Sequence, residues 1–221
     1  MTDATLDAYE RWAASYPPVA HNPLMRAEQR LMTEEWPAVR GQRVLDLACG
    51  SGRYTRLLCE ADAAQVVGMD FCLPMLERVA TASRICASMM QLPFKNGTFG
   101  AVVSGLAVGH AGDIHEWMSE IERVLLSGGT LLYSDFHPEA ARAGMTRSFK
   151  DRSDAIRIVP HRLHDVEAQL DAARAANLNI EAVREVRVGI ELREPFMGSE
   201  KFYRERHGLP VVLVVRARKP S

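Results

Sequence analysis

An apolar run that ends in a glycine turn is the feature of this sequence best suited to chemistry. Residues 44–52 read Val-Leu-Asp-Leu-Ala-Cys-Gly-Ser-Gly and include Gly50 and Gly52. Glycines at such a turn let backbone approach a ligand, and free N–H groups at the start of the following helix favour an anionic group. Asp70 ends the next apolar run, twenty positions after Gly50, where a carboxylate can accept both hydroxyls of a ribose. Together these features predict a site for an adenosine-containing cofactor.

The residues around the glycines discriminate between adenosine cofactors. A pyrophosphate-binding loop reads G-x-G-x-x-G, but here the third glycine position is Thr55. Asp46 precedes the turn, where its charge would repel a pyrophosphate and attract a cofactor that carries an ammonium and a sulfonium. The chain also has no Tyr-x-x-x-Lys motif. A nicotinamide oxidoreductase is therefore disfavoured, and it stays an alternative that tight NAD binding would revive.

The glycine turn resembles motif I of the class I S-adenosylmethionine-dependent methyltransferases. Asp46-Leu-Ala-Cys-Gly-Ser-Gly52 is similar to that motif, and Val66-Val-Gly-Met-Asp70 is similar to the acidic strand end that follows it. Later landmarks of the family have similar segments here, at residues 74–76, at Leu92-Pro-Phe94 with Phe99, and at residues 123–129. The resemblance covers Tyr9 to about Asp135, and its N-terminal part is similar to the ubiquinone-biosynthesis and malonyl-carrier-protein methyltransferase groups.

The resemblance implies S-adenosylmethionine as cofactor and S-adenosylhomocysteine as its product. It implies that the backbone of the glycine turn holds the methionine half and that Asp70 binds the ribose. Ser88 stands where the family commonly has an acid that meets the adenine amine, so a backbone N–H near Met89 or Met90 is expected to contribute there. The implied cofactor-binding residues are Tyr16, Asp46, Ala48, Gly50, Gly52, Asp70, Met75, Ser88 and Met89.

Short apolar runs alternate with amphipathic stretches from Arg43 onward, which is typical of a parallel sheet with crossover helices. Strands are expected at residues 43–47, 65–69, 84–87, 100–105, 130–134, 182–190 and 211–217, and helices at 6–16, 23–36, 52–61, 72–81, 114–126 and 165–176. The link between the last two strands contains no helical crossover, so one of them should run antiparallel to the rest. We expect an α/β, Rossmann-like, seven-stranded and mostly parallel sheet with an antiparallel last strand and helices on both faces.

The length of 221 residues favours a single domain. Residues 1–40 are expected to form a helical cap over the ligand edge of the sheet. Residues 135–164 and 191–210 are candidate inserts that cover a substrate, because long connections in compact domains often carry lids or binding loops.

Two histidines follow strands at the expected ligand edge and are the candidates for a catalytic base. His110 follows the fourth expected strand and His137 the fifth, where Pro138 restricts the backbone. A hydroxyl, phenol or acidic carbon needs a base to become nucleophilic, whereas a carboxylate or thiolate does not. Either histidine could instead be a polar residue that caps a loop.

Composition restricts the class of partner. The 27 basic and 28 acidic residues give a net charge of −1, so no global field would attract nucleic acid or anionic lipid. The chain has no apolar run long enough for a membrane span, and its four cysteines lack zinc-site spacing. We therefore expect a reduced, cytoplasmic protein without a metal site that acts on a small molecule.

The expected pocket mouth indicates what kind of small molecule this is. The first insert has a basic excess, which is either a solvated face or a site where an arginine fork holds the carboxylate or phosphate of an acidic acceptor. Aromatic and sulfur side chains near the mouth favour an aromatic acceptor, and they are Trp12, Tyr16, Met25, Phe136, Phe149, Phe196 and Phe202.

We interpret the chain as an S-adenosylmethionine-dependent methyltransferase that acts on a small molecule in biosynthetic or secondary metabolism. The alternative is a protein of the same fold that binds the cofactor without methylating, such as a cyclase or a regulator, because both would carry these motifs. The sequence does not determine the acceptor, the methylated atom or the oligomeric state.

Overall fold

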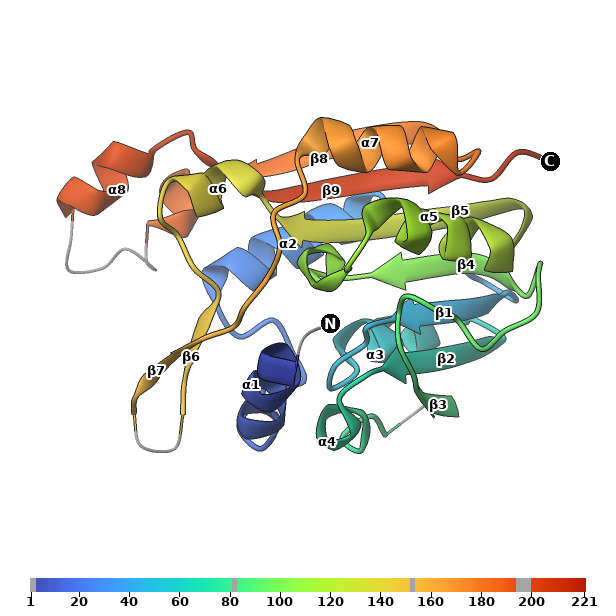
Figure 1. Ribbon diagram of the computed structural model, residues 1–221. Helices are drawn as coiled ribbons and strands as arrows, with labels where there is room; N and C mark the ends of the chain where they lie inside the picture. Colours follow the sequence, from blue (N-terminus) through green and yellow to red (C-terminus); the bar gives the residue numbers. More distant parts are fainter. Residues whose placement is uncertain (1–2, 81–82, 152–153, 194–199) are drawn as a thin grey trace.

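The computed structural model describes residues 3–80, 83–151, 154–193 and 200–221. A seven-stranded sheet forms its centre (Figure 1). The strands are β1 (Arg43–Leu47), β2 (Gln65–Asp70), β3 (Ser83–Cys86), β4 (Phe99–Ser104), β5 (Leu125–Phe136), β8 (Asn179–Arg187) and β9 (Pro210–Arg218), in the spatial order β3-β2-β1-β4-β5-β9-β8.

Strand directions agree with the expected topology. Strands β3, β2, β1, β4 and β5 are parallel, and β9 lies between β5 and β8 and runs antiparallel to both. The α/β, Rossmann-like class with an antiparallel last strand is thus confirmed. Strand β5 begins at Leu125 rather than Thr130, because the Ser127-Gly128-Gly129 segment that resembles a turn is part of the strand.

Helices cover both faces of the sheet. Helices α5 (Ile114–Val124) and α7 (Val166–Ala175) pack on one face, and α2 (Pro23–Glu34), α3 (Arg53–Glu60) and α6 (Pro138–Arg142) pack on the other. Successive strand residues point to opposite faces, so Leu45 joins the core under α5 while its neighbour Val44 joins the core under α2 and α3. The near-continuous apolar strands are explained by burial on both sides.

Helix α4 (Leu73–Leu76) is shorter than the stretch from 72 to 81 that the sequence predicts. Val79 instead packs against Cys49 and Leu76 in a small cluster, where it also lies against Gly52. Val79 thus packs on the glycine turn instead of continuing helix α4.

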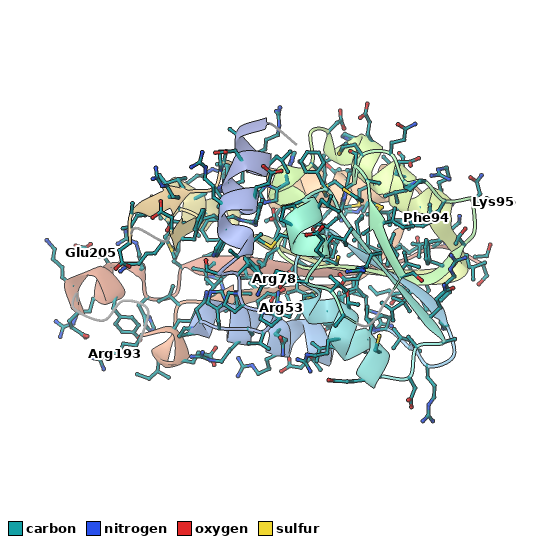
Figure 2. All side chains as sticks on the ribbon, turned by 90° about the horizontal axis from the view of Figure 1, so that it is seen from below. Arg53, Arg78, Phe94, Lys95, Arg193 and Glu205 are labelled. Atoms are coloured by element: carbon teal, nitrogen blue, oxygen red, sulfur yellow. The ribbon has the colours of Figure 1, made fainter. Side chains whose placement is uncertain are left out.

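The carboxyl edge of the parallel strands is covered by α1 (Asp3–Ala13) and by a hairpin of β6 (Ser148–Lys150) and β7 (Ile156–Ile158), as Figure 1 shows. The rings of Trp12 and Phe149 stack with centroids 4.6 Å apart and join the two covering elements. Arg78, labelled in Figure 2, donates to the carbonyls of Ala14 and Tyr16 and so fixes the segment after α1.

Helix α2 differs from the cap that the sequence suggests. Its side chains Ala27 and Met32 are buried in the sheet core, and the helix packs on β5, β8 and β9. Only the start of α2 reaches the edge that α1 covers. The remaining elements are the short helices η1 (Val108–His110), η2 (Ile190–Leu192) and α8 (Glu200–Arg206). Within the described ranges, no helix is both long and apolar enough to cross a membrane.

Candidate active site

A cavity of about 670 Å³ lies at the carboxyl ends of β1, β2, β4 and β5, beneath α1 and the β6–β7 hairpin. This is the edge at which open α/β sheets bind ligands. Of the residues expected from the sequence, those that line the cavity are Tyr16, Asp46, Ala48, Gly50, Asp70, Met75 and His110. Gly52, Ser88, Met89 and His137 lie outside its lining.

The glycine turn is held in place by Asp70. One carboxylate oxygen, Oδ2, accepts the backbone N–H of Gly50 at 2.8 Å, and Oδ1 accepts that of Cys72 at 2.8 Å. Burial raises the pKa of Asp70, although these N–H donors act in the opposite direction. Gly50 has a φ of 55°, and a Cβ placed on it would meet no atom within 4 Å. The turn therefore presents bare backbone next to a carboxylate.

Asp46 lies behind the turn with only 1% of its surface exposed. Thr55 donates its hydroxyl to Oδ2 of Asp46 at 2.5 Å. Burial raises the pKa of Asp46 to about 7, and the bond from Thr55 offsets part of that effect. Asp46 thus changes charge near neutral pH.

Three of the expected cofactor residues lie outside the cavity lining. Gly52, with φ 89°, is the N-cap of α3 and lies against Val79. Ser88 is exposed, and its hydroxyl accepts the N–H of Met90. Met89 is buried in the core beneath α5. Sequence position alone could not distinguish a residue beside the turn from one in the cavity wall.

The structure does not bring His137 to the cavity. Pro138 begins α6, and the ring of His137 turns back to cap that helix by accepting the N–H of Glu139 at Nδ1. Its Nε2 lies 3.4 Å from Oε1 of Glu185 on β8. Burial lowers the pKa of His137, while Glu185 acts to raise it. The stiff turn after β5 is present, but it directs the imidazole away from the expected substrate.

His110 does line the cavity, within a cluster of donors. Tyr9 from α1 places its hydroxyl 2.9 Å from Nε2 of His110, and Nη1 of Arg147 lies 3.3 Å from the same atom. Because a guanidinium can only donate, Nε2 is the acceptor and carries no proton. Burial, together with the charge of Arg147, lowers the pKa of His110 to about 2. This histidine is a neutral hydrogen-bond acceptor that links the covering elements to the sheet.

Arg147, in the first insert, is held between the cavity and a buried carboxylate. Its Nη2 donates to Oδ1 of Asp135 at 2.9 Å, and its Nη1 donates to the carbonyl of Leu106. Gly109 also donates its N–H to Asp135. Arg142, Lys150 and Arg157, around the hairpin, form more exposed pairs with Glu139, Asp154 and Asp151.

A second buried ion pair was not anticipated from the sequence. Glu28 on α2 is fully buried, and its carboxylate accepts from Nη1 of Arg53 at 2.6 Å, from the hydroxyl of Tyr54 at 2.7 Å and from that of Ser134 at 2.5 Å. Arg53 and Tyr54 line the cavity. The available signal was the placement of Glu28 four residues after Leu24 and four before Met32, on the apolar face of its helix.

Two aromatic residues of the expected pocket mouth cannot be placed. Phe196 and the side chain of Phe202 fall outside the described residues. Trp12, Tyr16, Met25 and Phe136 line the cavity, and Phe149 packs behind Trp12.

Part of the sequence matches a known protein family. Residues 45–133 match the family described as "Methyltransferase domain". The chain is 38% identical over 106 residues to a demethylmenaquinone methyltransferase of Thermus thermophilus, which covers 44% of this chain and 48% of that protein. It is 32% identical over 145 residues to a malonyl-acyl-carrier-protein O-methyltransferase of Halorhodospira halophila, covering 62% and 47%. The chain thus spans about half the length of these curated relatives.

Solved structures extend the likeness to nearly the whole chain. An S-adenosylmethionine-dependent methyltransferase from Mesorhizobium loti has a TM-score of 0.69 at 22% identity, covering 87% of this chain and 98% of that one. The cyclase SpnF has a TM-score of 0.70 at 19% identity, covering 98% and 94%. At such identities the likeness establishes the fold alone. Residues 45–133 thus match a methyltransferase domain, and the chain has the class I S-adenosylmethionine-dependent methyltransferase fold, as its motifs had indicated.

Proposed function

We propose that this protein is an S-adenosylmethionine-dependent methyltransferase that acts on a small molecule in biosynthetic or secondary metabolism. The observation that carries the proposal is the junction of Gly50 and Asp70 at the wall of the covered cavity. Bare glycine backbone and a carboxylate meet there, and Asp70 retains free lone pairs for the two hydroxyls of a ribose. The matched methyltransferase domain contains both residues.

The residues present fit this cofactor. Asp70 would hold the ribose and the turn through Gly50 the methionine half, with Tyr16 and Met75 on the same cavity wall. When bound, the cofactor supplies an electrophilic methyl group on a sulfonium. The anionic form of Asp46 would favour that positive charge. The chain contributes alignment and exclusion of water, through α1 and the hairpin, rather than covalent catalysis.

The position of His110 argues against general-base catalysis by an imidazole. Its Nε2 already faces two donors, and the charge of Arg147 opposes protonation. We propose that His110 positions Tyr9 and Arg147 instead. His137, the other candidate base, caps α6.

Calorimetric titration tests the cofactor assignment. S-adenosylmethionine and S-adenosylhomocysteine should bind, and NAD should not. Methyl transfer is then measured as formation of S-adenosylhomocysteine with a panel of small acids, phenols and quinols. Binding with no turnover across the panel would favour the non-methylating alternative, and a [4+2]-cyclase, SpnF, has a similar fold. Binding of NAD alone would overturn the proposal.

A further inference from the structure

Two guanidinium groups line the cavity while their counter-ions lie behind them. Arg53 and Arg147 are both in the lining, whereas their partners Glu28 and Asp135 are not. Both carboxylates are almost completely buried. The wall therefore presents N–H donors toward a ligand, and the negative charges that balance them are withdrawn into the protein.

Each guanidinium has more N–H donors than the described residues accept. Arg147 has five N–H donors, of which three go to Leu106, His110 and Asp135, and the hydroxyl of Tyr9 is within hydrogen-bond reach of the same guanidinium. Arg53 donates from Nη1 to Glu28 and Met25, and no described residue accepts from its Nε or Nη2. Since the Arg53 side chain is more than nine-tenths buried at the cavity wall, its remaining donors have little access to bulk water.

The cofactor can satisfy one of these sites. Arg53 directly follows the glycine turn, and its Nη2 would lie 3.3 Å from a Cβ built on Gly105 at the end of β4. The single carboxylate of S-adenosylmethionine would lie beside the glycine turn and can pair with Arg53. Arg147 comes from the insert beside the hairpin, where it contacts Tyr9, His110 and the carbonyl of Leu106. Because the cofactor has only one carboxylate, a second anion at Arg147 would come from the acceptor.

We propose that Arg147 forms a carboxylate subsite for the acceptor, which is a largely apolar small acid. This inference rests on the proposed function and adds the substrate class. Apolar side chains of Met25, Phe136 and Met145 make up much of the same cavity. A guanidinium binds a carboxylate through two parallel N–H bonds, which accounts for an arginine at this position.

The test compares acids with their uncharged amides. Benzoate and octanoate are titrated against the protein saturated with S-adenosylhomocysteine, beside benzamide and octanamide, with thermal unfolding and calorimetry as readouts. The acids should raise the melting temperature and the amides should not. Arg147→Gln should weaken acid binding about tenfold or more, and by a larger factor than it weakens binding of S-adenosylhomocysteine. Arg147→Lys keeps the positive charge but loses the two parallel N–H donors. Its affinity for the acids should therefore lie between that of the unmodified protein and that of Arg147→Gln.

Arg142→Gln is the matched control, because Arg142 lies in the same insert, is exposed and pairs with Glu139 and Asp165. It should bind the acids as the unmodified protein does. Equal responses to acids and amides, no acid response at millimolar concentration, or undiminished acid binding by both Arg147 variants would overturn the proposal. The titrations are repeated without S-adenosylhomocysteine. Failure of the protein to bind S-adenosylhomocysteine would then count against the proposed function, whereas an acid response that depends on Arg147 would still support the subsite.

Discussion

The backbone N–H of Gly50 donates to Oδ2 of Asp70 at 2.8 Å, across twenty residues of sequence and between the ends of two neighbouring strands. The acid therefore has two tasks, because it shapes the glycine turn and faces the cavity that the turn lines. Loss of this carboxylate should disturb cofactor binding both directly and through the turn.

Asp70→Ala should raise the dissociation constant for S-adenosylhomocysteine about tenfold to a hundredfold, since hydrogen bonds to a charged group are worth about 1.5 to 3 kcal/mol. Calorimetry measures the change. Asp171→Ala, which removes an exposed carboxylate on α7, is the control and should leave the affinity unaltered. An unchanged constant for Asp70→Ala would remove this residue from the cofactor site.

Gly50 and Gly41 form a matched pair for testing the turn. Both have positive φ, 55° and 71°, and a Cβ on either would meet no atom within 4 Å, but only Gly50 lines the cavity. Gly50→Ala and Gly41→Ala should each lower the free energy of unfolding by about 1 to 2 kcal/mol, the cost of left-handed backbone. Only Gly50→Ala should weaken binding of S-adenosylhomocysteine. Equal affinities in the two variants would show that the turn does not touch the cofactor.

Glu28→Gln should destabilise the protein strongly, because it leaves the buried guanidinium of Arg53 without its counter-ion. Breaking a buried pair from one side costs about 3 to 5 kcal/mol. Urea unfolding measures this loss, with Glu60→Gln in the exposed pair with Arg56 as control, for which less than about 1 kcal/mol is expected. Similar losses in the two variants would contradict a structural role for the Glu28 network.

Asp46 should make stability fall as pH rises. Burial raises its pKa in the folded protein to about 7, above the ordinary value of about 3.9 for an aspartate, so between these values the folded state binds the extra proton. The contribution of this group is fully present below about pH 4 and is lost by about pH 7. Urea unfolding across this range should show Asp46→Asn gaining stability relative to the unmodified protein as pH rises. If the difference in stability between Asp46→Asn and the unmodified protein does not change with pH, the pKa of Asp46 is not raised in the folded protein.

The stack of Trp12 on Phe149 should couple α1 to the hairpin. In a double-mutant cycle with Trp12→Ala and Phe149→Ala, the coupling in the free energy of unfolding should be about 0.5 to 1.5 kcal/mol. Both single variants should also weaken binding of S-adenosylhomocysteine, since each loosens the cover of the cavity. A coupling near zero would mean that the two elements close independently.

The sheet was predictable because its strands are buried on both faces and read as apolar runs. Strand β1 has the bounds that the sequence indicates, and β9 differs by one residue at each end. The hairpin was not predictable, because β6 and β7 have only three residues each and its buried side chain, Phe149, packs against the distant helix α1.

The residues of the cavity wall were predictable where they belong to a recognisable sequence motif, as Gly50 in the glycine turn and Asp70 at the end of the next strand do. They were not predictable where the direction of a side chain determines whether it reaches the cavity. His137 follows β5 as expected, yet its ring turns toward α6 and Glu185. Arg147 stood among several basic residues, and only the buried position of Asp135 distinguishes it from the exposed pairs.

The insertion of β9 between β5 and β8 constrains the order in which the nascent chain assembles. Strand β8 pairs only with β9 among the described strands, although it is synthesised before it. Until residues 210–218 leave the ribosome, β5 therefore has an open edge and β8 has no partner, and both are exposed to pairing with other chains. The final strand acts as a closing step, so folding of this domain is completed only after almost the whole of it has been translated.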